Sequence, residues 1–72
     1  MRTYYTIQCD NENKPEGIKT DKYFELKEGN LVYEYARICQ AHNLDYNIYI
    51  EHFDEDTDTI KEMINVNNEF KD

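Results

Sequence analysis

The shortness of the chain is what most restricts its fold. Seventy-two residues can build only one small hydrophobic core, because a chain of this size buries only about 60% of the surface that it exposes when unfolded. A catalytic cleft needs a scaffold that encloses a ligand on several sides. We therefore expect one compact domain over residues 1–72 and a function that does not depend on a deep cleft.

Three stretches, residues 3–9, 22–27 and 46–53, alternate between apolar and polar side chains. This period of two predicts β-strands. In the first stretch Tyr5 and Ile7 share one side of the strand. The second stretch is expected to pair with the first across a polar loop that holds the only proline.

Two other stretches have the apolar spacing of helices. The first follows Asn30, a good N-cap, and ends near Asn43. The second begins at Thr59, where Glu62 completes a capping box. The predicted buried face of the first helix is Leu31, Tyr35, Ile38, Cys39 and His42, with Val32 and Ala36 at its flank, and that of the second is Ile60, Met63, Ile64, Val66 and Phe70. The order β-β-α-β-α predicts an α+β domain in which two helices pack on one face of a three-stranded sheet.

The charge of the chain is strongly negative and unevenly distributed. Sixteen Asp and Glu against eight Lys and Arg give a net charge of −8. Residues 38–72 carry nine acidic and two basic side chains. This balance argues against direct binding to nucleic acid or to an anionic membrane. It favours a basic protein partner, because complementary charge speeds association.

Several features bear on the compartment. The first residues contain no apolar run typical of a signal peptide, and no later run is long enough to span a bilayer. Cys9 and Cys39 could form one disulfide at most. We therefore expect a cytoplasmic protein with reduced thiols, in the cytoplasm of the host cell if the chain is phage-encoded.

Neither metal motif that the sequence suggests is complete. Asp54, Asp56 and Asp58 have the first spacing of a calcium loop, but Thr59 and Asn65 occupy the positions that need Gly and Glu. The four possible zinc ligands are Cys9, Cys39, His42 and His52. Only Cys39 and His42 are close in sequence, and both lie on the apolar side of a predicted helix. We expect no metal and no cofactor.

Catalytic motifs are also missing. The sequence has no serine and only two glycines, which excludes a serine triad and a glycine-rich phosphate loop. A cysteine–histidine pair is conceivable, but neither cysteine lies at a helix N-terminus, where its pKa would fall. We expect the protein not to be an enzyme.

A line of carboxylates is the clearest candidate surface. On the predicted second helix Asp58, Glu62, Glu69 and Asp72 fall within about 80° of one another. Carboxylates four residues apart on a helix lie about 6 Å from each other, similar to successive phosphates of a nucleic acid. The alternative is a solvated face that keeps the protein soluble. The partner-binding residues that we predict are Glu51, Asp54, Glu55, Asp56, Asp58, Glu62, Glu69, Tyr49 and Tyr33.

Three hypotheses follow. In size, acidity and compactness the chain resembles small phage or mobile-element proteins that block CRISPR effectors, restriction enzymes or polymerases. This resemblance implies a non-enzymatic inhibitor that imitates phosphates and binds a basic nucleic-acid-handling protein. The second hypothesis is a regulatory or assembly protein that binds a partner, or a second copy of itself as a homodimer, through a sheet face containing Tyr4, Thr6, Gln8, Tyr49 and Phe53. The third is a protein that sequesters a small nucleotide with Tyr33 and Arg37.

Overall fold

A computed structural model of the chain describes residues 1–12 and 14–70. Within these residues it has one α-helix and one antiparallel sheet of four strands in the order β2-β1-β3-β4. The strands are β1 (Arg2–Gln8), β2 (Asp21–Glu25), β3 (Asn47–Asp54) and β4 (Thr59–Asn65). The helix α1 (Gly29–Ala41) follows the 3-10 turn η1 (Leu26–Glu28), and a second 3-10 turn, η2 (Asn67–Phe70), ends the described chain.

The prediction of a small α+β domain is confirmed, but the prediction of three strands and two helices is wrong. The three predicted strands correspond to β1, β2 and β3 within two residues at each end, and β2 pairs with β1 as expected. Residues 59–65 form the fourth strand instead of a second helix.

A β-bulge explains why β4 has the spacing of a helix. Opposite His52 and Phe53 the register shifts, so that Glu62 pairs with His52 while Ile60 pairs with Phe53. The extra residue reverses the alternation of side chains along β4. Ile60 and Met63 therefore lie on the same side of the sheet although they are three residues apart, as they would in a helix.

The acidic run between β3 and β4 is a tight turn. Asp58 has a positive φ of 54°, a conformation that Asp tolerates better than most residues. The Asp54 carboxylate accepts a hydrogen bond from the Asp56 N–H at 2.9 Å. This hydrogen bond and the conformation of Asp58 close the β3–β4 hairpin. The hairpin forms in place of the helix that the capping box of Thr59 and Glu62 suggested.

Helix α1 begins and turns differently from the prediction. It starts at Gly29 instead of after Asn30, because η1 leads directly into it. Its buried residues are Val32, Tyr35, Ala36 and Cys39. Leu31, Ile38 and His42, which were predicted to be buried, are exposed. The predicted end is confirmed, since Asn43 has a positive φ of 55° and follows the last turn.

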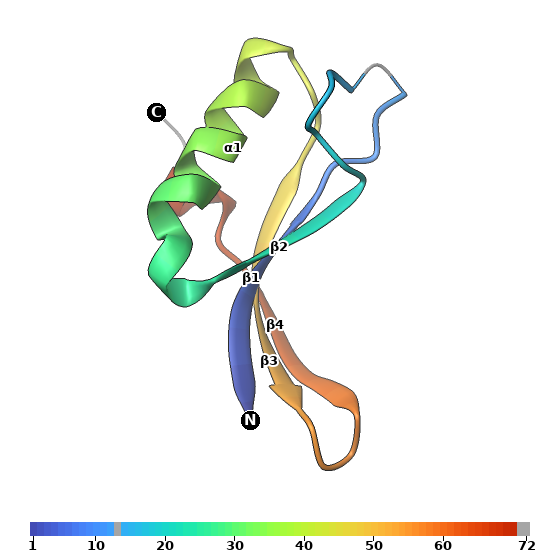
Figure 1. Cartoon of the computed structure of the whole chain (residues 1–72), viewed down its shortest axis with the longest axis vertical. Helices are drawn as coiled ribbons and strands as arrows, with labels where there is room; N and C mark the ends of the chain where they lie inside the picture. The colour runs from blue at the N-terminus through green and yellow to red at the C-terminus, as the bar shows by residue number, and fades with distance from the viewer. Residues whose placement is uncertain (13, 71–72) are drawn as a thin grey trace.

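The core lies between α1 and the two central strands. Ile7 of β1, Cys9 directly after β1, and Ile48 of β3 are fully buried against the helix. Phe70 of η2 is buried at the side of the helix, and its ring meets the ring of Tyr5 edge-on at 5.6 Å. Figure 1 shows that α1 covers one end of the sheet, while the β3–β4 hairpin extends beyond it.

The contrast between Ile48 and Ile60 gives a first prediction. Ile48 is 0% exposed and Ile60 is 48% exposed. Ile48→Ala is expected to lower the free energy of unfolding by about 2–5 kcal/mol, because it leaves a cavity in the core. Ile60→Ala is expected to change it by about 0.5 kcal/mol or less. Urea denaturation followed by circular dichroism measures both, and a larger loss for Ile60→Ala would support the two-helix arrangement instead.

The two core thiols give a second prediction. Cys9 and Cys39 are free and fully buried. Burial, followed by the neighbouring Cys9 thiol, raises the pKa of Cys39 to about 11. Both thiols are therefore expected to be inert to Ellman's reagent at pH 8 in the folded protein and to react in urea. The contribution of Cys39 to stability is present below its unfolded pKa and is lost as the pH rises towards 11. Equal reaction rates with and without urea would contradict this packing.

Candidate functional site

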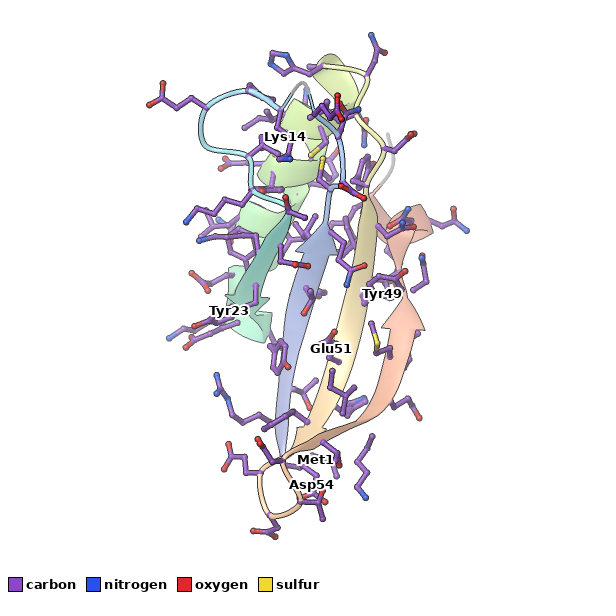
Figure 2. The ribbon with its side chains drawn as sticks, turned by 90° about the vertical axis from the view of Figure 1, so that its right-hand side faces the viewer. Met1, Lys14, Tyr23, Tyr49, Glu51 and Asp54 are labelled. Carbon is purple, nitrogen blue, oxygen red and sulfur yellow. The ribbon has the colours of Figure 1, made fainter. Side chains whose placement is uncertain are left out.

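The sheet has one face covered by α1 and one face that no helix covers, which we call the open face. Figure 2 shows the open face towards the viewer, with α1 behind the upper part of the sheet. Alternation along the paired strands places the following side chains on it: Arg2, Tyr4, Thr6, Gln8, Asp21, Tyr23, Glu25, Asn47, Tyr49, Glu51, Phe53, Ile60, Met63 and Asn65. Aromatic and apolar groups thus occupy all four strands of an uncovered surface.

Glu51 lies at the centre of the open face and is nearly buried. It is directly opposite Tyr4 on β1 and Met63 on β4, and only 5% of its surface is exposed. Figure 2 shows it near the middle of the sheet, on the same strand as Tyr49 and closer to the β3–β4 hairpin. Among residues 1–12 and 14–70, no ion pair to Glu51 forms. A carboxylate so enclosed needs hydrogen-bond donors.

The Tyr4 hydroxyl donates a hydrogen bond to the Glu51 carboxylate. Burial raises the pKa of Tyr4, and the hydrogen bond and negative charge of Glu51 raise it further, while Arg2 acts in the opposite direction. The same ring meets the Tyr23 ring at 6.1 Å, with an angle of 66° between their planes. Tyr4 therefore joins the buried carboxylate to the exposed aromatic surface.

Two shallow depressions lie on either side of the Tyr4–Tyr23 pair. The larger, of about 280 Å³, is lined by Tyr4, Thr6, Gln8, Asp21, Lys22, Tyr23 and Glu51. The smaller, of about 250 Å³, is lined by Arg2, Tyr4, Tyr23 and Phe53. In the smaller one the Arg2 guanidinium lies 5.7 Å from the centre of the Tyr4 ring. Both depressions therefore present aromatic rings together with charged groups.

Most of the predicted acidic binding residues do not form one line. Asp54 lies 3.8 Å from Lys61, Glu55 lies 3.9 Å from Arg2, and Glu62 lies 4.0 Å from His52. The remaining members of the predicted set are also dispersed: Asp56 and Asp58 lie in the β3–β4 turn and Glu69 in η2, while Asp72 lies outside the described residues. The predicted helical stripe is not formed, because the helix that would carry it is a strand.

The predicted tyrosines lie on different surfaces. Tyr49 is on the open face. Tyr33 is on α1, and the Arg37 guanidinium lies 5.8 Å from the centre of its ring. Neither Tyr33 nor Arg37 lines either depression. The nucleotide-binding hypothesis is therefore not associated with either of these depressions.

Sequence reasoning missed Tyr23, Arg2 and Met63. The alternation of residues 22–27 places Tyr23 on the side opposite Phe24, and this signal could have identified it. Met63 was assigned to the buried side of a helix, so that its place beside Glu51 could not be foreseen.

The possible metal ligands do not gather at one place. Cys9 and Cys39 meet in the core, His42 is exposed at the end of α1, and His52 lies on β3. Within the part of the chain that the structure describes, no group of three or more His, Cys, Asp or Glu side chains is arranged to hold a metal ion.

A hydroxyl–imidazole–carboxylate series lies on the helix side of the sheet, beyond the end of α1. The Thr3 hydroxyl is 2.9 Å from His52 Nδ1, and His52 Nε2 is 4.0 Å from Glu62. A catalytic triad also needs a substrate cleft and donors for the oxyanion. Neither depression contains these three residues, so the open face is the better candidate site.

Comparison with protein-family models, with curated proteins and with solved structures finds no match for this chain. In the part that the structure describes, α1 is too short to cross a bilayer. The geometry of the open face is therefore the basis on which a function can be assigned.

The hydrogen bond from Tyr4 to Glu51 gives a third prediction. Tyr4→Phe removes the donor and leaves the buried carboxylate without it. We expect the free energy of unfolding to fall by about 1–3 kcal/mol. The matched control is Tyr23→Phe, because Tyr23 is 63% exposed, and it should change stability by about 0.5 kcal/mol or less. Equal losses for both variants in urea denaturation would show that the Tyr4 hydroxyl does not support Glu51.

Proposed function

We propose that the protein is a non-enzymatic binding protein that holds a basic protein against the open face of its sheet. The observation that carries this proposal is the composition of that face. Tyr4, Tyr23, Tyr49 and Phe53 lie on it without a covering layer, around the nearly buried carboxylate of Glu51. Tyr and Phe are enriched in protein interfaces because they offer rigid contact area.

The apolar part of the open face continues onto β4. Met63, beside Glu51, is 45% exposed, and Ile60 is exposed next to Phe53. Exposed apolar groups that adjoin one another across strands mark interaction surfaces more often than scattered ones do. A partner that covers β1, β3 and β4 would remove these side chains from water.

Charge supports a basic partner. The chain carries a net charge of −8, and the open face itself contributes the carboxylates of Asp21, Glu25 and Glu51 against the single guanidinium of Arg2. Complementary charge attracts a basic protein over several ångströms and raises its association rate. The exposed acidic turn between β3 and β4 adds to this field at one end of the sheet.

Binding is also better supported than catalysis. Neither depression is lined by a histidine or a cysteine, the side chains that most often supply a general base or a thiol nucleophile. Each is also smaller than the pockets of about 300–1,000 Å³ that enclose small molecules. Aromatic rings and carboxylates in shallow depressions suit side chains that project from another protein.

An inhibitor or antagonist of a nucleic-acid-handling protein is one form that this function can take. Such proteins hold phosphates with arginine and lysine, and a surface that binds those side chains excludes the nucleic acid. The two free, buried cysteines support a reducing compartment such as the cytoplasm. In this form the acidic open face would bind the basic side chains of the partner, a role that the sequence assigned to a line of carboxylates on a helix.

Paired baits test the proposal. The wild-type protein and the double variant Tyr23→Lys/Tyr49→Lys would be used to capture proteins from the native host, followed by mass spectrometry. We expect the wild type to capture a basic protein that the variant does not. The purified partner should then bind the variant at least ten-fold more weakly, and the wild type more weakly as salt is raised.

The matched control is Leu31→Lys/Ile38→Lys, which adds the same charge to exposed positions of α1 and should leave binding unchanged. Loss of binding in this control but not in the open-face variant would overturn the proposal. A second copy of the chain is the other possible occupant. A dimer in light scattering that Tyr23→Lys/Tyr49→Lys dissociates would replace the basic partner by self-assembly.

A further inference from the structure

We propose that the larger depression of the open face binds an arginine side chain of the partner. The guanidinium would stack against Tyr4 and Tyr23 and donate hydrogen bonds to the Glu51 carboxylate. This inference rests on the proposed function, because it names the group by which a basic protein would be recognised.

The size of the depression fits one side chain. Its volume is about 280 Å³, just below the range of pockets that enclose whole small molecules. It is bounded by Tyr4 and Thr6 of β1, by Asp21 and Tyr23 of β2, and by Glu51 of β3. A side chain that enters it from a partner therefore meets two rings and two carboxylates.

Glu51 supplies the specific acceptor. Its residue surface is 5% exposed, and among residues 1–12 and 14–70 no ion pair to it forms. A carboxylate can accept about four hydrogen bonds, and Tyr4 provides one. Lys22 lines the same depression, but its ammonium lies 5.4 Å from the Phe24 ring centre, on the helix side of the sheet. An incoming cation would compensate a buried charge that lacks a counter-ion.

The aromatic rings supply a surface for a flat cation. The Tyr4 and Tyr23 rings meet edge-on at 6.1 Å, so they present differently directed surfaces to the depression. The chain already makes one such contact, since the Arg2 guanidinium lies 5.7 Å from the Tyr4 ring centre in the neighbouring depression. Cations within about 6 Å of an aromatic ring centre are attracted by its electron-rich face.

This combination favours arginine over lysine. A guanidinium is planar, stacks on aromatic rings and pairs with a carboxylate through two parallel hydrogen bonds. It is also less strongly hydrated than an ammonium, so that it enters a nearly buried site such as that of Glu51 with a smaller loss of hydration.

A titration with small probes tests the site directly. Chemical shifts of the ¹⁵N-labelled protein would be followed as N-acetyl-argininamide is added. We expect saturable shifts at Tyr4, Thr6, Tyr23 and Glu51, with a Kd on the order of 1 mM for a probe of this size. N-acetyl-citrullinamide has the same shape without the charge and should bind at least ten-fold more weakly. N-acetyl-lysinamide should also bind more weakly than the arginine probe.

Matched variants locate the interaction. Glu51→Gln should weaken binding of N-acetyl-argininamide at least ten-fold, whereas Glu62→Gln, which makes the same change on the other side of the sheet, should not weaken it. Tyr23→Leu provides a second variant in case Glu51→Gln disturbs the fold, which the ¹⁵N spectrum reports. Equal binding of the citrulline or lysine probe, or full binding by Glu51→Gln, would overturn the arginine site.

The two proposals fail in different ways. If the captured basic partner binds Glu51→Gln as tightly as the wild type but loses affinity for Tyr23→Lys/Tyr49→Lys, the open face is the interface and the arginine site is wrong. If the arginine probe binds as expected and no basic partner is captured, the proposed function is wrong, and the inference about a partner is wrong with it.

Discussion

The packing of α1 against the two central strands is the interaction on which the rest of this structure depends. Ile7, Cys9 and Ile48 are fully buried by the helix residues Val32 and Cys39 and their neighbours. No second α-helix contributes to this core in the described chain, although Phe70 of η2 does. The helix of 13 residues is about 20 Å long, whereas the eight residues of β3 extend over about 27 Å. One helix therefore covers only part of one face.

Two surfaces result from this mismatch. On the helix side, the β3–β4 hairpin extends beyond α1 (Figure 1), and β4 is exposed along its whole length. On the other side, the open face has no covering layer, and its order depends on contacts between side chains of neighbouring strands. The contact of Tyr4 with both Glu51 and Tyr23 is central among these. It connects β1 with both of its neighbouring strands and keeps a carboxylate largely out of water.

The negative charge of the protein has several structural roles instead of one. Asp54 and Asp58 belong to the turn of the β3–β4 hairpin, and Glu28 accepts a hydrogen bond from the Glu25 N–H where η1 begins. Exposed pairs such as Glu55 with Arg2 contribute little stability because water and salt screen them. Glu51 differs from all of these because it is the one acidic residue that is buried within the described chain. Its position makes it the most informative acidic group for function.

The sequence by itself determined the three strands with a period of two, the helix and its end at Asn43, and the acidic excess, because these depend on neighbouring residues or on composition. It also placed Tyr4 and Tyr49 on a sheet face different from that of Tyr5 and Ile7. Only the tertiary structure decided the state of residues 59–65, since pairing with β3 and a bulge at the shift between His52 and Phe53 give a strand the spacing of a helix. It likewise decided which strands are neighbours, and so brought Tyr4, Tyr23 and Met63 around Glu51. Strand register is a long-range property, and no local pattern in this chain encodes it.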